Sequence, residues 1–166
     1  MTDSLAPERR SWNMSRIRGK DTKPEIAVRK ALHAAGYRFR LHVKELPGKP
    51  DIVLPKWKTV VFVHGCFWHS HDGCKDATIP KTKTEWWVEK LAKNKIRDTL
   101  NCEALVRAGW HILIVWECSF KQSSEFSDIE RFKEIASGFI VNGSDVFEIS
   151  YHNMTSSNVL CNKKAR

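Results

Sequence analysis

The sequence predicts a single α/β domain in which a mixed central β-sheet is flanked by helices. Residues 59–64 and 111–117 are short, continuous apolar runs, the pattern expected of strands that are covered on both faces. Residues 22–36 and 84–109 instead repeat apolar side chains at helical spacing. Elements mixed in this order fold with helices packed on the faces of a sheet.

The first helix is predicted from the signals at its ends. Thr22 is a typical N-cap, Pro24 falls in the first turn, and Glu25 stands three residues after the cap, as in a capping box. Gly36 stands where a helix commonly ends. The apolar stripe between them consists of Val28, Ala31, Leu32 and Ala35.

Three strands are predicted after this helix. Residues 37–43 alternate apolar and polar side chains, which indicates a half-buried strand. A turn containing Pro and Gly, residues 46–50, leads to a second strand at 51–54, and residues 59–64 form the third.

The second half of the chain begins with the long helix, residues 84–109. The buried strand 111–117 and a helix over 128–139 follow, and the pattern weakens beyond about Gly143. The apolar positions of the long helix are Val88, Leu91, Ala92, Cys102 and Val106.

Length and charge set the domain organisation. We expect one domain over residues 1–150 that includes a basic arm, residues 1–20, and a flexible tail over residues 151–166. Residues 1–110 carry 22 basic and 12 acidic side chains, whereas residues 111–166 carry 6 and 7, so the net charge of +9 is concentrated in the first part. This favours a polyanionic partner, although a solvated lysine surface would also produce it.

The seven tryptophans strengthen the case for nucleic acid, because aromatic rings stack on unpaired bases. Most of them would also suit a core, and Trp86 is expected there. No window approaches the roughly 20 consecutive apolar residues of a membrane span, and no apolar run follows the basic N-terminus. We therefore expect a cytoplasmic protein with no membrane partner, whose five cysteines do not form a disulfide framework.

The densest motif is VHGCFWHSHDGC, residues 63–74, which contains two cysteines and three histidines. The Cys-x4-His-x2-Cys spacing of Cys66, His71 and Cys74, with Cys118 after a later buried strand, fits a closed tetrahedral zinc site. Scattered reduced cysteines are the alternative. One structural zinc would leave at least one histidine free for other work.

Asp51 stands at the start of a predicted strand, directly after a turn. A carboxylate in this position can hold Mg²⁺ beside a phosphate, since this hard cation takes oxygen ligands, but it can equally cap the turn. Asp98, on the long helix, can orient a histidine or pair with Lys95. One face of that helix carries Trp87, Lys90, Asn94 and Asp98.

Five motifs resemble the very-short-patch repair (Vsr) endonuclease family, in the same order. They are NMSRIRGKDT, LPGKPD, VHGCFWH, WWVEKLAKN and GWHILIVWEC, and the resemblance runs from about Trp12 to Cys118. It implies a restriction-endonuclease-like fold and a Mg²⁺-dependent enzyme that nicks one strand of duplex DNA 5′ to the thymine of a T·G mismatch. Such mismatches arise by deamination of 5-methylcytosine in the target sequence of a cytosine-5 methyltransferase. The resemblance further implies a monomer that acts at the nucleoid, in a pathway shared with that methyltransferase and other mismatch-repair proteins.

The resemblance also assigns roles to residues. Asp51 is similar to the family's Mg²⁺ ligand, with the backbone carbonyl of Val63, and His69 resembles the general base, oriented by Asp98. His64 resembles a second catalytic histidine and Glu25 an acidic active-site residue, although the capping box alone would explain Glu25. The zinc ligands implied are Cys66, His71, Cys74 and Cys118.

The DNA contacts implied by the resemblance begin with an aromatic wedge. Because a mismatched pair is easier to unstack than a matched one, rings inserted beside it discriminate through deformation energy. Lys90 and Asn94 would read base edges, and Met14 and Ile17 would approach from the arm in the other groove. The wedge rings are Phe67, Trp68 and Trp87, and the phosphate contacts include Arg16, Arg18 and Lys20.

Two departures from the family pattern stand out. Val63 replaces a hydroxyl residue, which matters only if that side chain has a role, and Asp72-Gly73 lengthens the zinc loop by one residue. Two alternative functions remain at this point. One is a zinc-stabilised protein that binds mismatched or bent DNA without strong catalysis, and the other is a nuclease of the same fold with a different target.

Overall fold

The computed structural model describes Arg9, Trp12 and residues 19–120 and 126–150. The predicted tail and most of the predicted arm, including Met14, Arg16, Ile17 and Arg18, lie outside the described residues. Within the described part of the chain, no helix combines the length and apolar character needed to cross a membrane.

A five-stranded mixed sheet forms the centre of the molecule, with the strands in sequence order. Adjacent strands are antiparallel from β1 to β3 and parallel from β3 to β5, which confirms the predicted fold class. The strands are β1 (Arg40–Leu41), β2 (Ile52–Leu54), β3 (Thr59–His64), β4 (His111–Trp116) and β5 (Val146–Ile149).

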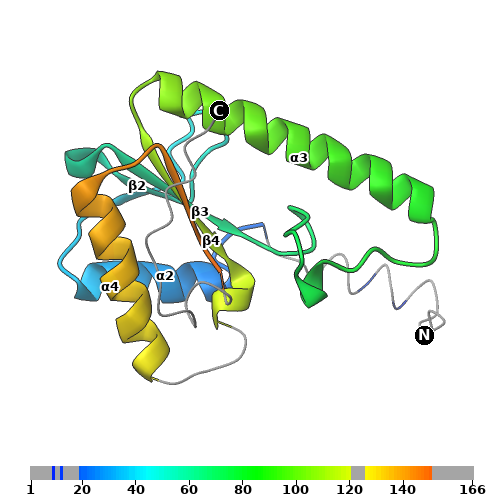
Figure 1. Cartoon of the computed structure of the whole chain (residues 1–166), viewed down its shortest axis with the longest axis horizontal. Helices are drawn as coiled ribbons and strands as arrows, with labels where there is room; N and C mark the ends of the chain where they lie inside the picture. Colours follow the sequence, from blue (N-terminus) through cyan, green and yellow to red (C-terminus); the bar gives the residue numbers. More distant parts are fainter. Residues whose placement is uncertain (1–8, 10–11, 13–18, 121–125, 151–166) are drawn as a thin grey trace.

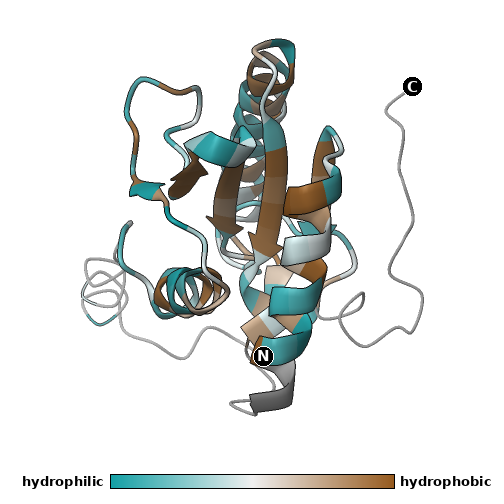
Figure 2. Ribbon diagram, turned by 90° about the vertical axis from the view of Figure 1, so that its left-hand side faces the viewer, coloured by the Kyte–Doolittle hydropathy of each residue, from teal (hydrophilic) through white to brown (hydrophobic). Residues whose placement is uncertain are grey.

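Helices cover both faces of this sheet. Helices α2 (Lys23–Ala34) and α4 (Phe126–Asn142) lie on one face and α3 (Thr84–Arg107) on the other, and α3 extends well beyond the strands (Figure 1). The hydropathy colouring in Figure 2 places the most hydrophobic ribbon in the strands between the helices. Alternate β3 residues explain the two cores: Val61 packs with α2 and α4, and Val60 packs with Leu105 of α3.

The predicted capping box of α2 is confirmed. The Thr22 side chain accepts a hydrogen bond from the backbone N–H of Glu25, and the Glu25 side chain accepts one from the backbone N–H of Thr22. Gly36 then takes a φ of +88°, which glycine adopts without steric strain.

Two predictions about strands were wrong. The alternating segment 37–43 pairs only at Arg40–Leu41, and Leu41 is 43% exposed because β1 is a short edge strand. Strand β5, not predicted, follows Gly143 and pairs with β4. Strand β5 is only four residues long and has Glu148 between Phe147 and Ile149, so it lacks the continuous apolar run of β3 and β4.

The predicted faces of α3 were also partly wrong. Leu91 is buried, but Val88 is 47% exposed and Ala92 is exposed, because this half of the helix projects past the sheet. Trp86, expected in the core, is 50% exposed for the same reason.

Candidate active site and metal centre

Strand pairing brings Asp51 to the end of β3. Strand β2 begins just after Asp51 and runs antiparallel to β3, with Ile52 opposite Val61. Asp51 therefore lies beside the last residues of β3, where its Oδ2 accepts a 2.8 Å hydrogen bond from the backbone N–H of Val63. His64 is the next residue along, so a carboxylate and an imidazole meet at one edge of the sheet.

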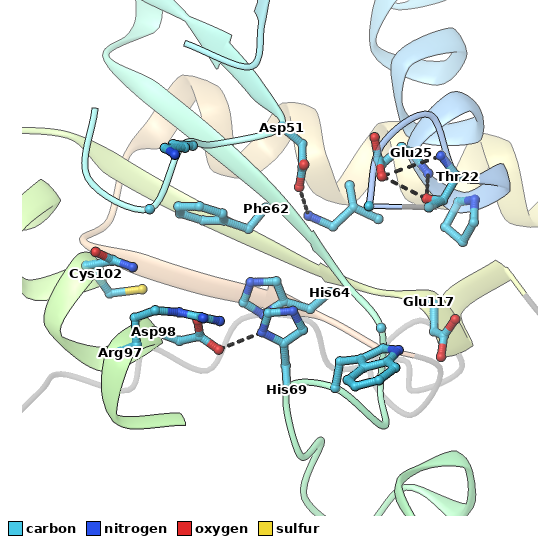
Figure 3. Close-up of a pocket in the computed structure, with 18 of the residues that line it drawn as sticks. Thr22, Glu25, Asp51, Phe62, His64, His69, Arg97, Asp98, Cys102 and Glu117 are labelled. Atoms are coloured by element: carbon cyan, nitrogen blue, oxygen red, sulfur yellow. Dashed lines mark hydrogen bonds and ion pairs between the residues drawn. The ribbon is translucent and has the colours of Figure 1, made fainter. Parts of the chain in front are cut away.

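A cavity of about 830 Å³ opens at this edge (Figure 3). Strand ends, the α2 N-terminus, the loop after β3 and the middle of α3 all contribute to its wall. The structure thus brings together all of the residues predicted as catalytic: Glu25, Asp51, His64, His69 and Asp98.

His69 and Asp98 form a close pair. The Nδ1 of His69 lies 2.6 Å from Oδ2 of Asp98, whereas Lys95, the alternative partner, pairs with Asp72. Although burial opposes the effect, the hydrogen bond with His69 lowers the pKa of Asp98, so this carboxyl is ionised. An ionised partner at Nδ1 selects the tautomer in which Nε2 of His69 carries no proton.

His64 stacks on His69. Their ring centroids are 3.8 Å apart and their planes differ by 6°. Burial, together with the adjacent His69, lowers the pKa of His64 to about 3, so its imidazole is neutral at physiological pH. Figure 3 shows the two rings lying against each other, with Asp98 directed at His69.

Asp51 and Glu25 are two carboxylates of the cavity wall, and the charge of Glu25 repels that of Asp51. Burial raises the pKa of Asp51 to about 6, and the Glu25 carboxylate adds to the rise, whereas the hydrogen bond from Val63 opposes it. A cation bound at Asp51 would relieve this repulsion. Carboxylate and main-chain carbonyl oxygens are ligands that suit a hard cation such as Mg²⁺, so the residues present fit that ion.

A second cluster gathers the four predicted zinc ligands. The ligand atoms of Cys66, His71, Cys74 and Cys118 lie within 4.8 Å of one another. His71 Nδ1 is 3.5 Å from Sγ of Cys66 and 3.6 Å from Sγ of Cys118. Tetrahedral Zn–S and Zn–N bonds of about 2.3 and 2.1 Å would separate sulfur and nitrogen by about 3.6 Å, so the cluster fits such an ion.

The extra residue in this loop is accommodated by a turn. Gly73 has a φ of +70°, and the backbone N–H of Cys74 donates to the carbonyl of His71 at 3.3 Å. The four ligand atoms therefore converge despite the insertion. The neighbouring Cys118 sulfur and burial raise the pKa of the Cys66 thiol, and a bound cation would counteract this by stabilising the thiolate.

The predicted wedge residues form an aromatic cluster. The rings of Phe67, Trp68 and Trp87 have centroids 5.1 to 5.9 Å apart and pack at steep angles. Trp86 adds a fourth ring, 4.7 Å from Trp87, which is why its exposure is compatible with packing. These three half-buried rings, from the start of α3 and from the loop after β3, are available to stack on a base.

Lys90 and Asn94, predicted to read bases, both contact this cluster. The Nζ of Lys90 lies 4.6 Å from the ring centroid of Trp86 and 5.7 Å from those of Trp68 and Trp87. Asn94 Nδ2 donates to the backbone carbonyl of Trp68 at 3.1 Å. Both side chains thus help to hold the wedge rings in place.

Several charged residues in or beside the cavity were not predicted from the sequence. Glu117 accepts a 3.1 Å hydrogen bond from the backbone N–H of Cys66, and its position directly after a buried strand was a usable signal. Arg29 pairs with Glu25, four residues earlier on α2, and this i, i+4 spacing was also visible. The basic residues that line the cavity are Lys44, Lys49 and Arg97.

Comparison with known proteins gives a consistent group of relatives. A family profile described as "DNA mismatch endonuclease Vsr" matches residues 2–75. Type II nicking enzyme V.XorIIP of Xanthomonas oryzae is 52% identical over 118 residues, which cover 71% of this chain and 86% of that protein. V.NmeAIP of Neisseria meningitidis, also a type II nicking enzyme, is 48% identical over 75% of this chain and 88% of that protein. DNA mismatch endonuclease Vsr of Escherichia coli is 39% identical over 81% of this chain and 87% of that protein.

Proposed function

The chain belongs to the Vsr family of DNA mismatch endonucleases, and we propose that it nicks one strand of duplex DNA 5′ to the thymine of a T·G mismatch. The observation that carries this proposal is the single cavity in which Asp51, His64 and the His69–Asp98 pair meet. A carboxylate that holds a metal ion and an oriented imidazole that takes a proton from water are groups that can catalyse hydrolysis of a phosphodiester.

Each side chain has a distinct task in the proposed reaction. Asp98 keeps the proton of His69 on Nδ1, so that Nε2 takes a proton from the attacking water. As the water oxygen bonds to phosphorus, the bond from phosphorus to O3′ breaks, and O3′ takes a proton from solvent. The products are a 3′-hydroxyl and a 5′-phosphate. His64 fixes the plane of the His69 ring by stacking on it.

Two metal ions support the proposed enzyme. Asp51 and the backbone carbonyl of Val63 would hold Mg²⁺, which supplies a Lewis acid for the charge that develops on the phosphate. A structural Zn²⁺ would attach the loop after β3 to the end of β4. Its four ligands would be Cys66, His71, Cys74 and Cys118.

The aromatic cluster accounts for the choice of a mismatch. Phe67, Trp68 and Trp87 would enter the base stack, where a T·G pair is easier to unstack than a matched pair. We propose that Lys90 and Asn94 contact base edges from the same helix. Arm residues Met14 and Ile17 would enter the opposite groove, while Arg16, Arg18 and Lys20 contact phosphates.

The remaining proposals rest on family membership. We expect a monomer that acts on cytoplasmic, nucleoid DNA. Its T·G substrates would come from deaminated targets of a cytosine-5 methyltransferase, and other mismatch-repair proteins would act in the same pathway.

Incubation of labelled duplexes with the protein and Mg²⁺ tests this function. Duplexes with a T·G pair in varied flanks should be nicked 5′ to the thymine, and matched T·A duplexes and the variant Asp51→Asn should give no product. Binding without a nick in any flank would instead favour a mismatch-binding protein. Nicking of matched DNA would point to a nuclease with another target.

A further inference from the structure

A second charged cluster borders the cavity at the start of α2. Asp21, Glu25 and His42 each offer one ligand atom, and these atoms lie within 4.8 Å of one another. Two carboxylates and an imidazole at this spacing are a donor set for a divalent cation such as Mn²⁺. The side chain of Arg29, however, contacts all three residues.

The guanidinium of Arg29 fits this place closely. Nη1 lies 2.5 Å from Oδ1 of Asp21, and Nη2 lies 2.8 Å from Oε2 of Glu25 and 3.0 Å from Nε2 of His42. Because a guanidinium can only donate hydrogen bonds, Nε2 of His42 is the acceptor in this contact. Among the described residues, the buried Nε–H of Arg29 has no hydrogen-bond partner. The guanidinium is therefore held through the contacts of Nη1 and Nη2.

These contacts fix the orientation of Glu25. Its side chain is nearly inaccessible, with the residue only 3% exposed. Oε1 accepts a 2.9 Å hydrogen bond from the Thr22 hydroxyl, and Oε2 accepts from the backbone N–H of Asp21 at 3.0 Å as well as from Arg29. With both oxygens engaged, Glu25 has a single orientation at the cavity wall.

The same contacts connect α2 to Asp51, the residue directly before β2. The backbone N–H of His42 donates to the backbone carbonyl of Asp51 at 3.3 Å. A chain of contacts therefore runs from Glu25 through Arg29 and His42 to the main chain of Asp51. Its effect is to hold two carboxylates of like charge near each other with a cation beside them.

We propose that Arg29 is a positioning residue that takes the place of a second divalent ion beside Glu25 and holds Glu25 and Asp51 in their catalytic arrangement. The inference rests on the proposed nicking reaction with Mg²⁺ at Asp51. It follows that protein side chains bind one catalytic divalent ion directly, at Asp51. Glu25 binds the guanidinium of Arg29 in place of a second ion.

Removal of the guanidinium tests the proposal without DNA. In Arg29→Met, the ligands Asp21, Glu25 and His42 are left without their cation, so calorimetric titration of the zinc-loaded protein with Mn²⁺ should show one more bound ion than the wild type. The double variant Arg29→Met, Glu25→Gln should lose that ion again. Arg131→Met is the matched control, because Arg131 forms an exposed ion pair with Glu134 on α4. This control variant should bind the same number of Mn²⁺ ions as the wild type.

Activity provides the second measurement. Nicking by Arg29→Met, at a Mg²⁺ concentration that saturates the wild type, should fall by about 10- to 100-fold, the usual effect of losing a group that orients a metal site. An unchanged Mn²⁺ stoichiometry or an unchanged nicking rate in a folded Arg29→Met protein would overturn the proposal. Absence of nicking by the wild type would contradict the proposed function instead, and the Mn²⁺ titration would still test Arg29.

If Arg29→Met does not fold, the variant Arg29→Lys tests the positioning role of Arg29. Lysine keeps the charge but cannot reach Glu25 and His42 with two nitrogens of one planar group. We expect a thermal unfolding midpoint close to that of the wild type and a nicking rate at least about tenfold lower. A wild-type rate in this variant would rule out a positioning role.

Discussion

At the residue scale, the site depends on proton positions that its neighbours fix. The 2.6 Å contact with Asp98 engages Nδ1 of His69, a residue that lines the cavity, so Nε2 is the nitrogen that would accept a proton in the proposed reaction. The adjacent His64 is neutral because burial disfavours its charged form. In the proposed reaction the two stacked histidines therefore take different roles, His69 as the base and His64 as the neutral ring that supports it.

The variant Asp98→Asn tests the role of the carboxylate. An amide no longer favours the tautomer with its proton on Nδ1 of His69, so single-turnover nicking should fall by about 10²- to 10⁴-fold, while T·G duplex binding stays within about twofold. Lys93→Gln, which breaks an exposed ion pair with Glu89 on the same helix, serves as the control. An Asp98→Asn rate equal to that of the control would exclude the proposed orientation.

The buried His64 predicts a pH dependence of stability. Its folded pKa of about 3 lies below its unfolded value of about 6.5, so its contribution is complete above pH 6.5 and is lost as pH falls towards 3. Between pH 7 and 5 this loss should reach about 2 kcal/mol. Urea unfolding of the wild type and of His64→Asn, at pH values from 7 to 5, measures this loss. The difference in the free energy of unfolding between the two proteins should change over this range, and a constant difference would contradict the low pKa of His64.

At the scale of elements, the segment between β3 and α3 needs an external support. Over residues 65–83 its regular structure is limited to the 3₁₀ turn Lys75–Ala77, yet it carries His69 and two wedge rings. The cysteine and histidine cluster joins it to Cys118 at the end of β4. A metal ion there would therefore support both catalysis and recognition.

Cys74→Ser should separate the metal site from the other cysteines. The variant should lose its zinc and unfold at a much lower temperature, because structural zinc contributes roughly 10–16 kcal/mol in small peptides. Zinc content by mass spectrometry and thermal unfolding measure both effects. Cys102→Ser is the control, since Cys102 is a half-buried cysteine of the cavity outside the cluster. A zinc-free Cys74→Ser protein of normal stability would rule out the site.

At the scale of the whole molecule, affinity and selectivity belong to different parts. The basic excess of residues 1–110 attracts a phosphate backbone of any sequence, and it cannot distinguish a mismatch from a matched pair. Discrimination requires groups that enter the base stack, and in the proposed function these would be the rings at the projecting end of α3 and in the adjacent loop.

The variant Arg16→Gln tests whether the basic arm contributes to DNA affinity without contributing to mismatch selectivity. The slope of log binding constant against log salt should decrease by about one, and binding to T·G and T·A duplexes should weaken equally. Lys133→Gln on α4, where Lys133 pairs with Glu130, is the control and should leave the slope unchanged. A change in the T·G to T·A ratio for Arg16→Gln would show that the arm reads the mismatch.

Local patterns were sufficient for much of the fold. The α2 cap, both apolar strands and the long helix were predicted because capping and hydrophobic periodicity involve residues close in the chain. The edge strands were not. Strand β1 is shorter than its alternating pattern suggested, and β5 is too short for a recognisable pattern, because an edge strand depends on pairing with its neighbour.

Short motifs along the chain were enough to identify the candidate catalytic residues, metal ligands and wedge rings, because each motif consists of neighbouring residues. The contacts among these side chains depend on how the elements pack. Asp98 pairs with His69, 29 residues away, as the family resemblance implied, whereas the residue pattern alone left Lys95 as an equal alternative. Trp86 lies at the surface because α3 extends past the sheet. Arg29 fills the space among Asp21, Glu25 and His42. These outcomes depend on the packing of distant segments, which spacing along the chain does not encode.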